Sequence, residues 1–270
     1  MNAPFEHEAS PVDYKSLRAL VVDDYPGMRN ALRLTLSNFG ITKIQIASNA
    51  AEALFQIRNK DYDFILCDFN LGEGRDGQQL LEELRHANLI PLETVFMMVT
   101  SESFYEKVVA TAELAPDDYM IKPFSAEALC SRLETVLLRK RAFREVYRHF
   151  AANELEAAID ACDTLMRDQP RYLVDALRFK GELLVTLGRF EEAEALYKQV
   201  IEMRAIPWAR LGLARSLHLQ QKDDAAEEEL RDMLERAPEM VAAYDLLSDV
   251  CAAKKDTAGA QQALERGVAV

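Results

Sequence analysis

The sequence predicts an α/β domain followed by an all-α domain, in which a doubly wound five-stranded parallel sheet is joined to a solenoid of about four helical hairpins. Three observations support this prediction. The chain has 270 residues, about twice the common domain size of roughly 100–150 residues. Short apolar runs alternate with helical patterns as far as residue 138, and beyond it the sequence repeats with a period near 34 residues. We therefore expect a polar N-terminal arm at 1–15, an α/β domain at 16–138 and helical repeats at 139–270.

Five short apolar runs in the first half are typical of strands buried on both faces: 17–22, 44–47, 64–67, 95–99 and 119–121. Amphipathic stretches such as 28–39 and 77–85 lie between them. In the first of these stretches Leu32 and Leu36 recur at helical spacing, and Gly40 ends the pattern. Strands that alternate with helices in this way imply a parallel sheet with helices on both faces.

The last helix of this domain is predicted to begin after Ser125, a good N-cap residue, and its pattern continues to about His149. Its apolar residues form one group that can face the sheet and one that can face the repeats: Leu129, Leu133, Val136 and Leu137, then Ala142, Phe143, Val146 and Phe150. We expect this helix to continue directly into the first repeat helix, or to join it with little slack. The alternative is two helices broken near 139–141. A rigid junction would pass a rearrangement on to the repeats, whereas a flexible one would make the first domain a tether.

Self-similar segments of the second half end on alanines that are 35, 33 and 34 residues apart: Ala158, Ala193, Ala226 and Ala260. Four residues after each alanine comes an apolar residue, one helical turn further along a shared buried stripe: Cys162, Tyr197, Leu230 and Leu264. The predicted repeats are approximately 139–173, 174–206, 207–240 and 241–270. A period near 34 is typical of stacked helix–turn–helix units that bury their faces against their neighbours.

This half resembles the tetratricopeptide repeat. Its small residues Gly181 and Ala214 fall in first helices and Gly188 falls at a turn, while the four alanines fall in second helices. The segment Trp208-x-x-Leu211-Gly212 is two residues out of register with the third alanine. The resemblance implies a surface that binds an unknown protein or peptide. First-helix register places five residues in its groove: Arg178, Glu182, Trp208, Arg215 and Asp245.

Two alternatives stay open in this half. Trp208, the sole tryptophan, either anchors a partner or fills the interface between the second and third repeats. The array ends at 267–270 without a polar capping helix. Either the last repeat docks on a partner or another subunit, or the chain is part of a longer protein, and we favour the second.

The net charge of −13 argues against binding to nucleic acid or anionic membranes, because such a surface repels phosphates. No apolar stretch approaches the ~18–20 residues that cross a bilayer, and residues 1–11 contain no apolar signal core, so we expect a cytoplasmic protein. The four cysteines are scattered, and we interpret them as buried apolar residues rather than metal ligands or disulfides.

Polar residues follow the predicted strands. Asp23 and Asp24 follow the first strand, and Asp68 ends the third. Thr100 ends the fourth, and Lys122 follows the fifth. Because the carboxyl ends of parallel strands meet at one edge, we expect these side chains to lie together. Three carboxylates there repel unless a cation neutralises them, and an oxygen-only ligand set suits Mg²⁺ better than zinc. A nucleophile, a metal and an ammonium are what phosphoryl transfer requires, although each residue alone is more often a cap, a turn former or a solvated loop residue.

Residues 17–138 resemble the receiver domain of two-component response regulators, which has a flavodoxin-like fold. The motifs Asp-Phe-Asn-Leu-Gly at 68–72 and Asp-Asp-Tyr-Met-Ile-Lys-Pro-Phe at 117–124 carry the resemblance, together with Gly77 and the acidic residues. The resemblance implies that Asp68 accepts a phosphoryl group from a kinase phosphohistidine. It also implies that Asp24 and Asp68 bind Mg²⁺ with the backbone carbonyl of Asn70, while Asp23 acts mainly through bound water.

Further roles follow from the same resemblance. Lys122 would pair with the phosphoryl group, Thr100 would move to hydrogen-bond it, and Tyr119 would rotate into the vacated space. Asn70 and Glu102 would tune the lifetime, and their combination resembles members that dephosphorylate fast, which implies a transient signal. Dimerisation through the fourth and fifth receiver helices would follow phosphorylation.

We therefore expect a cytoplasmic response regulator of a two-component phosphorelay. It is not an enzyme in the usual sense, although the receiver would catalyse its own phosphorylation and dephosphorylation. Its partners would be a sensor histidine kinase or phosphotransfer protein, a protein bound by the repeats and a second copy of itself. One alternative is a constitutive repeat scaffold or adaptor whose receiver is a docking or phosphate-sink module. Another, an aspartyl-nucleophile phosphatase, would need an acid where Asn70 stands.

Overall fold

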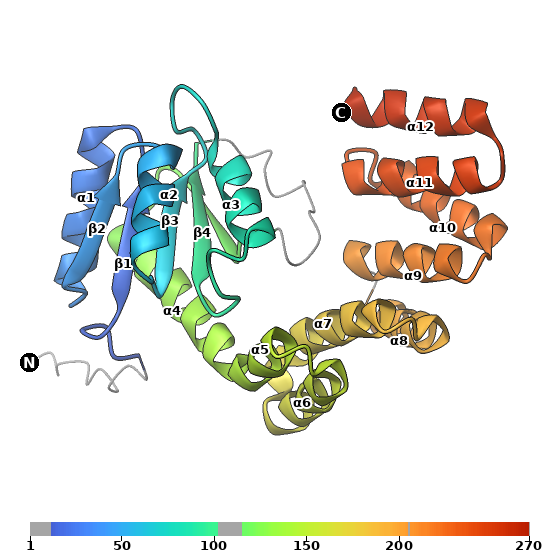
Figure 1. Cartoon of the computed structure of the whole chain (residues 1–270), viewed down its shortest axis with the longest axis horizontal. Helices are drawn as coiled ribbons and strands as arrows, with labels where there is room; N and C mark the ends of the chain where they lie inside the picture. Colours follow the sequence, from blue (N-terminus) through green and yellow to red (C-terminus); the bar gives the residue numbers. More distant parts are fainter. Residues whose placement is uncertain (1–11, 102–114, 205, 270) are drawn as a thin grey trace, which may run out of the picture. The chain divides into compact units, whose positions relative to one another are not determined.

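Figure 1 shows the computed structural model of the chain, which describes residues 12–101, 115–204 and 206–269. These residues form two compact units that divide between Ala142 and Phe143. The division lies four residues later than the sequence predicts, because Arg139, Lys140 and Arg141 belong to the last helix of the first unit. No helix in these described ranges is both long enough and apolar enough to span a membrane.

The first unit is a five-stranded parallel sheet in the order β2-β1-β3-β4-β5, which confirms the predicted fold class. Its strands are β1 (Arg18–Val22), β2 (Lys43–Ala47), β3 (Phe64–Asp68), β4 (Val95–Thr100) and β5 (Asp118–Ile121). The helices among the described residues of this unit are α1 (Pro26–Asn38), α2 (Ala50–Asn59), α3 (Gly77–His86) and α4 (Ala126–Ala142). The central strands β3 and β4 are buried almost throughout, as strands covered on both faces must be.

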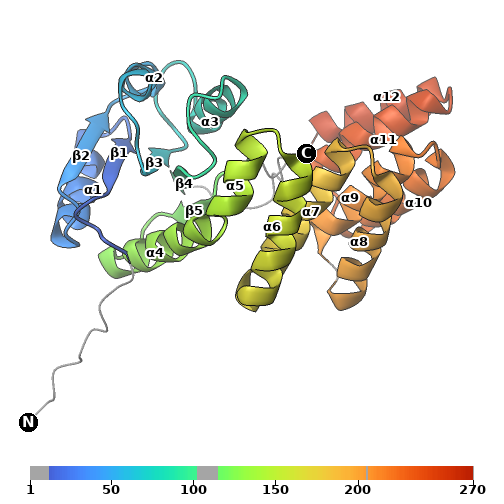
Figure 2. The same cartoon turned by 60° about the horizontal axis from the view of Figure 1, so that its bottom comes forward.

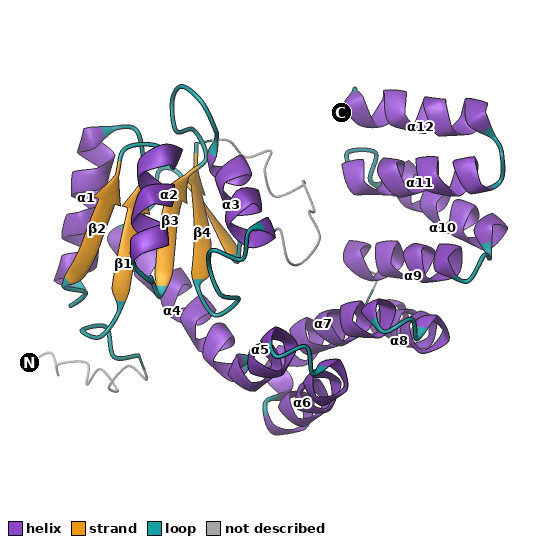
Figure 3. Ribbon diagram, in the orientation of Figure 1, coloured by secondary structure: helices purple, strands orange, loops and turns teal. Residues whose placement is uncertain are grey.

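Helices cover both faces of this sheet (Figures 1 and 3). Leucines of α1 and α4 share one core with alternate residues of β1, β3 and β4, and Leu129 and Leu133 of α4 lie in it as the sequence predicts. Ala53 of α2 and Leu80 of α3 are fully buried on the other face. Ser125 accepts the N–H of Ala128, which confirms the predicted cap of α4.

Two residues of the predicted polar arm at 1–15, Val12 and Tyr14, contact the core of the first unit. Val12 is 4 % exposed and belongs to the core beside α1, and Tyr14 packs against that core. The flanking polar residues hid this contact, because a single buried valine leaves no periodic pattern.

The second unit consists of four consecutive helical hairpins, shown from another direction in Figure 2. The first pairs α5 (Arg144–Ala151) with α6 (Leu155–Asp168), and a short 3₁₀ turn, η2 (Pro170–Tyr172), follows. The others are α7 (Leu173–Thr186) with α8 (Phe190–Met203), α9 (Pro207–Leu219) with α10 (Asp223–Arg236), and α11 (Val241–Ala253) with α12 (Thr257–Val268). Each helix packs on the one before it, and the first helices of neighbouring hairpins also touch. This is the predicted helical solenoid.

The repeated alanines mark its buried stripe. Ala158, Ala193 and Ala226 are all 0 % exposed, and the residues four positions later in those helices are buried as well. The fourth repeat departs from the pattern, since Leu264 is 49 % exposed. In the described chain no helix follows α12, so this stripe lacks the cover that the next hairpin provides elsewhere.

The junction between the units is short in sequence. α4 ends at Ala142 and α5 begins at Arg144, with Phe143 between them at φ −83° and ψ 1°. The helical stretch is interrupted at that residue and not at 139–141. Phe143 is 2 % exposed and packs on Tyr147 and Phe179, with ring centroids 5.7 and 6.4 Å away.

Candidate functional site

Hydrogen bonds to the backbone fix the turn that carries Asp23 and Asp24 after β1. The Asp23 carboxylate accepts the N–H of Tyr25 at 2.8 Å, which shapes the turn into α1. From the first turns of that helix Arg29 donates to the carbonyls of Asp23 at 2.6 Å and Asp24 at 2.9 Å. Sequence reasoning missed Arg29. Its signal was a cation close to a helix N-terminus, where the helix dipole disfavours positive charge.

Lys122 joins two strands at the same edge. Its Nζ lies 2.8 Å from Oδ2 of Asp68 and 3.1 Å from Oδ2 of Asp23. The Asp23 side chain is 1 % exposed, that of Asp68 12 % and that of Lys122 16 %. Oxygens of Asp23, Asp24 and Asp68 all lie within 4.8 Å of one another. We call these three residues the acid cluster. The predicted convergence of acids and lysine is therefore present, with three negative charges facing one positive charge.

The electrostatics of this edge follow from burial and crowding. Burial raises the pKa of Asp68, and the charge of Asp23 acts in the same direction, whereas the hydrogen bond from Lys122 opposes them. Burial would lower the pKa of Lys122, but its hydrogen bond to Asp68 and the charge of Asp23 raise it overall. The ammonium therefore remains charged at neutral pH, and Asp68 favours its neutral form more than an ordinary aspartate does.

Gly77 lets α3 begin directly beside Asp68. A Cβ built on Gly77 would lie 2.4 Å from the carbonyl oxygen of Asp68 and 2.9 Å from Sδ of Met98. The Gly77 N–H donates to the Phe69 carbonyl at 2.7 Å. Any side chain at this position would push α3 away from the end of β3.

The remaining predicted residues lie around this edge. Thr100 is 1 % exposed at the end of β4, and its carbonyl accepts the N–H of Lys122 at 2.7 Å. Tyr119 is half-buried in β5, and Asn70 is exposed two residues after Asp68. Glu102 lies outside the described residues.

The acid cluster fits a divalent cation that prefers oxygen ligands. The three carboxylates keep net negative charge, because one lysine pairs with only two of them, and their oxygens are close enough to share one ion. No His or Cys joins them among the described residues, so the donor set is one that suits magnesium rather than zinc.

In the repeats, three of the five predicted groove residues meet. The Arg178 guanidinium lies 5.8 Å from the centre of the Trp208 ring and 3.7 Å from the Glu182 carboxylate. Trp208 is half-buried and packs edge-to-face on Tyr197 at 6.3 Å, so it fills the interface between the second and third hairpins. Arg215 and Asp245 are exposed, and Arg215 lies near enough to Tyr197 to affect its pKa.

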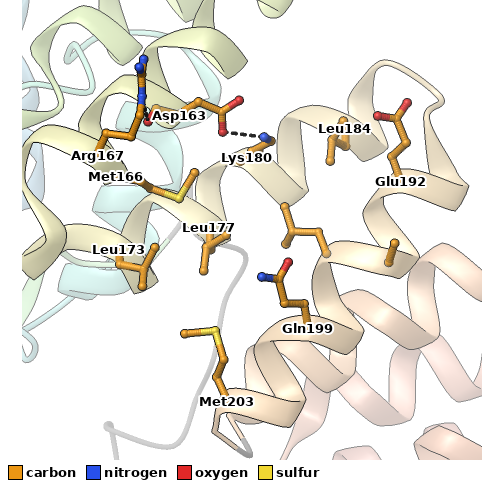
Figure 4. Close-up of a pocket in the computed structure, with 12 residues that line it drawn as sticks. Asp163, Met166, Arg167, Leu173, Leu177, Lys180, Leu184, Glu192, Gln199 and Met203 are labelled. Atoms are coloured by element: carbon orange, nitrogen blue, oxygen red, sulfur yellow. Dashed lines mark hydrogen bonds and ion pairs between the residues drawn. The ribbon is translucent and has the colours of Figure 1, made fainter.

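A groove of about 730 Å³ lies elsewhere on the repeats, between α6, α7 and α8 (Figure 4). Leu177, Leu184 and Leu196 are buried in its wall, and Met203 is 55 % exposed at its end. Its rim carries the ion pair of Asp163 with Lys180, which Figure 4 shows as a dashed line. Sequence reasoning missed this groove, because its residues come from three helices and share no repeat position.

Comparison with known proteins finds a family match in each half of the chain. A family model for the response regulator receiver domain matches residues 19–134, and a model for the tetratricopeptide repeat matches residues 175–206. The chemotaxis protein CheY-3 of Vibrio cholerae is 30 % identical over 131 residues, which cover 46 % of this chain and 95 % of that protein. The chemotaxis protein CheY of Pseudomonas aeruginosa is 28 % identical over 123 residues, covering 46 % of this chain and 98 % of that protein.

A solved response regulator from Thermotoga maritima, in complex with Mg²⁺ and BeF, is 27 % identical. The alignment covers 45 % of this chain and 99 % of the Thermotoga chain, with a TM-score of 0.40. Each of these two curated relatives covers less than half of this chain. The receiver match at residues 19–134 and the 30 % identity to a relative that is covered to 95 % place this chain in the response regulator family, as a receiver domain followed by tetratricopeptide-like repeats.

Proposed function

We propose that this protein is a two-component response regulator that accepts a phosphoryl group on Asp68 in a Mg²⁺-dependent reaction and signals through its repeats. The observation that carries the proposal is the position of Lys122, 2.8 Å from Asp68 and 3.1 Å from Asp23, beside a third carboxylate on Asp24. A nucleophilic oxygen, a cation site and an ammonium lie together at one edge of the sheet.

The ion would be held by Asp24, Asp68 and the backbone carbonyl of Asn70, with Asp23 acting mainly through bound water. When bound, Mg²⁺ supplies positive charge that lowers the repulsion between the carboxylates and the incoming phosphoryl oxygens. Without the ion, the carboxylates of the acid cluster repel the phosphoryl oxygens. With the ion bound, that repulsion is reduced and the phosphoryl group can approach Asp68.

A carboxylate oxygen of Asp68 attacks the phosphorus of the donor. The new O–P bond forms as the N–P bond to the donor imidazole breaks, and the imidazole nitrogen keeps the electron pair. Lys122, which Asp68 and Asp23 now share, reorients toward the phosphoryl oxygens and neutralises part of their charge. Because Lys122 stays charged, it donates hydrogen bonds without transferring a proton.

The phosphoryl group then changes the surroundings of Asp68. Thr100 donates its hydroxyl to a phosphoryl oxygen, and Tyr119 turns into the space behind it. The added charge and acceptor oxygens bias this two-state arrangement. Water later hydrolyses the acyl phosphate, at a rate set by Asn70 and Glu102, so the signal is transient. The receiver promotes these steps only on itself, and the protein is a signalling component rather than an enzyme.

A receiver domain takes its phosphoryl group from a donor such as a histidine kinase or phosphotransfer protein, and repeats of this kind bind proteins. We propose a cytoplasmic protein whose phosphorylated form pairs with a second copy and presents the repeats to a partner. Among the described residues, we consider two surfaces for that partner. One is formed by Arg178, Glu182 and Trp208, and the other is the groove between α6, α7 and α8. The net charge of −13 disfavours nucleic acid and anionic lipid as partners.

Incubation with acetyl phosphate and Mg²⁺ tests the first step. We expect the intact mass to rise by one phosphoryl group, and we expect hydroxylamine to remove it, as it does acyl phosphates. Asp68→Asn should stay unlabelled, whereas Asp61→Asn, at an exposed carboxylate outside the acid cluster, should label normally. A wild-type protein that stays unlabelled with the metal present contradicts the proposal.

The constitutive scaffold makes a different prediction. Sizing and partner capture are compared with and without beryllofluoride and Mg²⁺, with Asp68→Asn as the reference. A switch changes mass or partners only in the wild type with the phosphoryl mimic. Identical mass and partners in all three samples would favour a constitutive scaffold with a docking or phosphate-sink receiver.

A further inference from the structure

Buried charges also gather at the opposite edge of the sheet, where β4 and β5 begin. Asp117 directly precedes β5, and its side chain is 12 % exposed. The side chains of Lys140, in the last turn of α4, and Arg85, in the last turn of α3, are each 7 % exposed. Charges are buried at a cost unless they are paired, so this grouping is maintained by specific contacts.

Each oxygen of the Asp117 carboxylate has its own partner. Oδ1 lies 2.7 Å from Nζ of Lys140, and Oδ2 accepts the N–H of Phe96 in β4 at 2.8 Å. The Arg85 guanidinium lies 3.8 Å from Oδ2. Arg139 donates to the backbone carbonyl of Asp117 at 2.7 Å. Two consecutive residues near the end of α4 therefore hold one residue at the start of β5.

Lys140 is bound to the sheet edge on a second side. Its ammonium also donates to the carbonyl of Leu92, in the loop before β4. Burial lowers the pKa of Lys140, Asp117 opposes that effect, and Arg85 lowers the pKa further. The pairing with Asp117 therefore keeps a buried ammonium in place where apolar surroundings disfavour it.

The same two strands connect this grouping to the acid cluster. β5 is four residues long, with Asp117 before it and Lys122 after it. At about 3.3 Å per residue the two ends lie roughly 16 Å apart along an extended, stiff segment. β4 likewise has Phe96 near its start and Thr100 at its end. If Thr100 or Lys122 moves toward a phosphoryl group, β4 or β5 moves with it. Asp117 connects both strands to α4, because it precedes β5 and bonds to Phe96 of β4 and Lys140 of α4.

We propose that Asp117 and Lys140 are a positioning pair that transmits the displacement of β4 and β5 on phosphorylation to the last turn of α4, and through Phe143 to the first repeat helix. The inference rests on the proposed function, since it needs Asp68 to be phosphorylated. Without the pair, the receiver still accepts the phosphoryl group, but the end of α4 no longer follows β5.

The neighbouring residue provides a matched control. Asp118 also bonds to a basic residue of α4, since Arg132 donates to it at 2.8 Å, but Arg132 is 49 % exposed and lies two turns before Lys140. Asp117→Asn and Asp118→Asn are therefore the same change at consecutive positions. Lys140→Gln tests the other partner of the pair.

Hydrogen exchange of the full chain, with Mg²⁺ present and with or without beryllofluoride, separates the possible roles. One window, 64–72, reports on the acid cluster, and the other, 144–151, covers α5. In the wild type and in Asp118→Asn, we expect the mimic to change exchange in both windows. In Asp117→Asn and Lys140→Gln, we expect the change at 64–72 to remain and the change at 144–151 to be lost.

Each other outcome counts against a named statement. No change at 64–72 in the wild type overturns the proposed function itself. A change at 64–72 without one at 144–151 in the wild type overturns the inference alone, as does a wild-type response of α5 in Asp117→Asn. If Lys140→Gln does not fold, Asp117→Asn decides the question, because its amide oxygen can still accept the Phe96 N–H. A purely structural pair would speed exchange in both windows without removing the response to the mimic.

Discussion

At the scale of single residues, the acid cluster is a place where folding and function oppose each other. The Lys122 ammonium pairs with the carboxylates of Asp23 and Asp68. A carboxylate oxygen of Asp24 lies within 4.8 Å of an oxygen of each of them. Burial raises the pKa of Asp68, which means that the folded state resists its ionisation. A fold that keeps this group must derive its stability elsewhere, and the buried leucine core around the sheet supplies it.

The raised pKa of Asp68 sets the sign of a pH effect. Between the ordinary aspartate pKa and the raised one, the folded state binds more protons than the unfolded state, so stability falls as pH rises through that window. Asp68→Asn removes the titrating carboxyl group. Without metal at neutral pH we expect the variant to be more stable than the wild type by on the order of 1 kcal/mol, with a flatter pH dependence.

Urea unfolding between pH 4 and 8 in a chelator measures the effect, with Asp61→Asn as the exposed control. A variant that is less stable than the wild type at neutral pH would show that the bond to Lys122 outweighs the repulsion.

Magnesium should stabilise the folded wild-type protein. At a free Mg²⁺ concentration ten times the dissociation constant, binding to the folded state alone adds about 1.4 kcal/mol to the free energy of unfolding. We expect this gain in the wild type and its loss in Asp24→Asn, because the variant lacks one carboxylate of the acid cluster. The measurement is thermal unfolding in calcium-free buffer at a series of magnesium concentrations. Equal gains in both proteins would place the ion elsewhere.

At the scale of elements, close packing of helices depends on residues with no side chain. Tyr197 of α8 is 3 % exposed, and its ring lies against Gly181 of α7 and Gly212 of α9. A Cβ on Gly212 would lie 2.5 Å from Cζ of that ring, and one on Gly181 would lie 2.7 Å from it. The two glycines form the socket that brings three helices together around one aromatic side chain.

This socket predicts an inverted effect of a helix-favouring change. Gly→Ala inside a helix usually stabilises it by about 1 kcal/mol. Gly212→Ala should instead lower the free energy of unfolding by about 1–3 kcal/mol, because the methyl group overlaps the Tyr197 ring. Urea unfolding of Gly212→Ala, Tyr197→Leu and the double variant forms a cycle. The smaller leucine should relieve the overlap, so strictly additive effects would contradict the socket.

At the scale of the whole molecule, the described residues form two compact units and one acid cluster. The acid cluster lies in the unit that ends at Ala142. Magnesium alone, without a phosphoryl mimic, should therefore protect the slowest amides of β1, β3 and β4 from hydrogen exchange and leave those of α9 and α11 unchanged. Equal protection in both units would mean that they unfold as one cooperative body.

Much of this architecture was predictable from local pattern. The five strands begin and end within a residue or two of the predicted runs. For β1, β3 and β4 the reason is burial, because buried parallel strands are continuous apolar segments. The acid cluster and its neighbour Lys122 were also predictable, since Asp23, Asp24 and Lys122 follow strands and Asp68 ends one, and parallel strands end at one edge. The repeated alanines predicted the hairpins for a similar reason, because stacking one unit on the next requires a small residue at the same position each time.

Other features depended on contacts between residues far apart in the chain. Asp117 bonds to Phe96 and to Lys140, and neither spacing produces a periodic pattern. The burial of Val12, the exposure of Leu264 and the groove between α6, α7 and α8 likewise depend on which neighbour is present in space.

The five strands, the repeat period and the residues of the acid cluster were thus predictable from the sequence, because each leaves a local pattern, whereas the strand order came from the structure. The pairing of Lys122 with two carboxylates at once and the pairing of Asp117 with α4 required the folded structure. Which partner a buried charge selects is decided by geometry and desolvation after the elements pack, and those are properties of three-dimensional proximity.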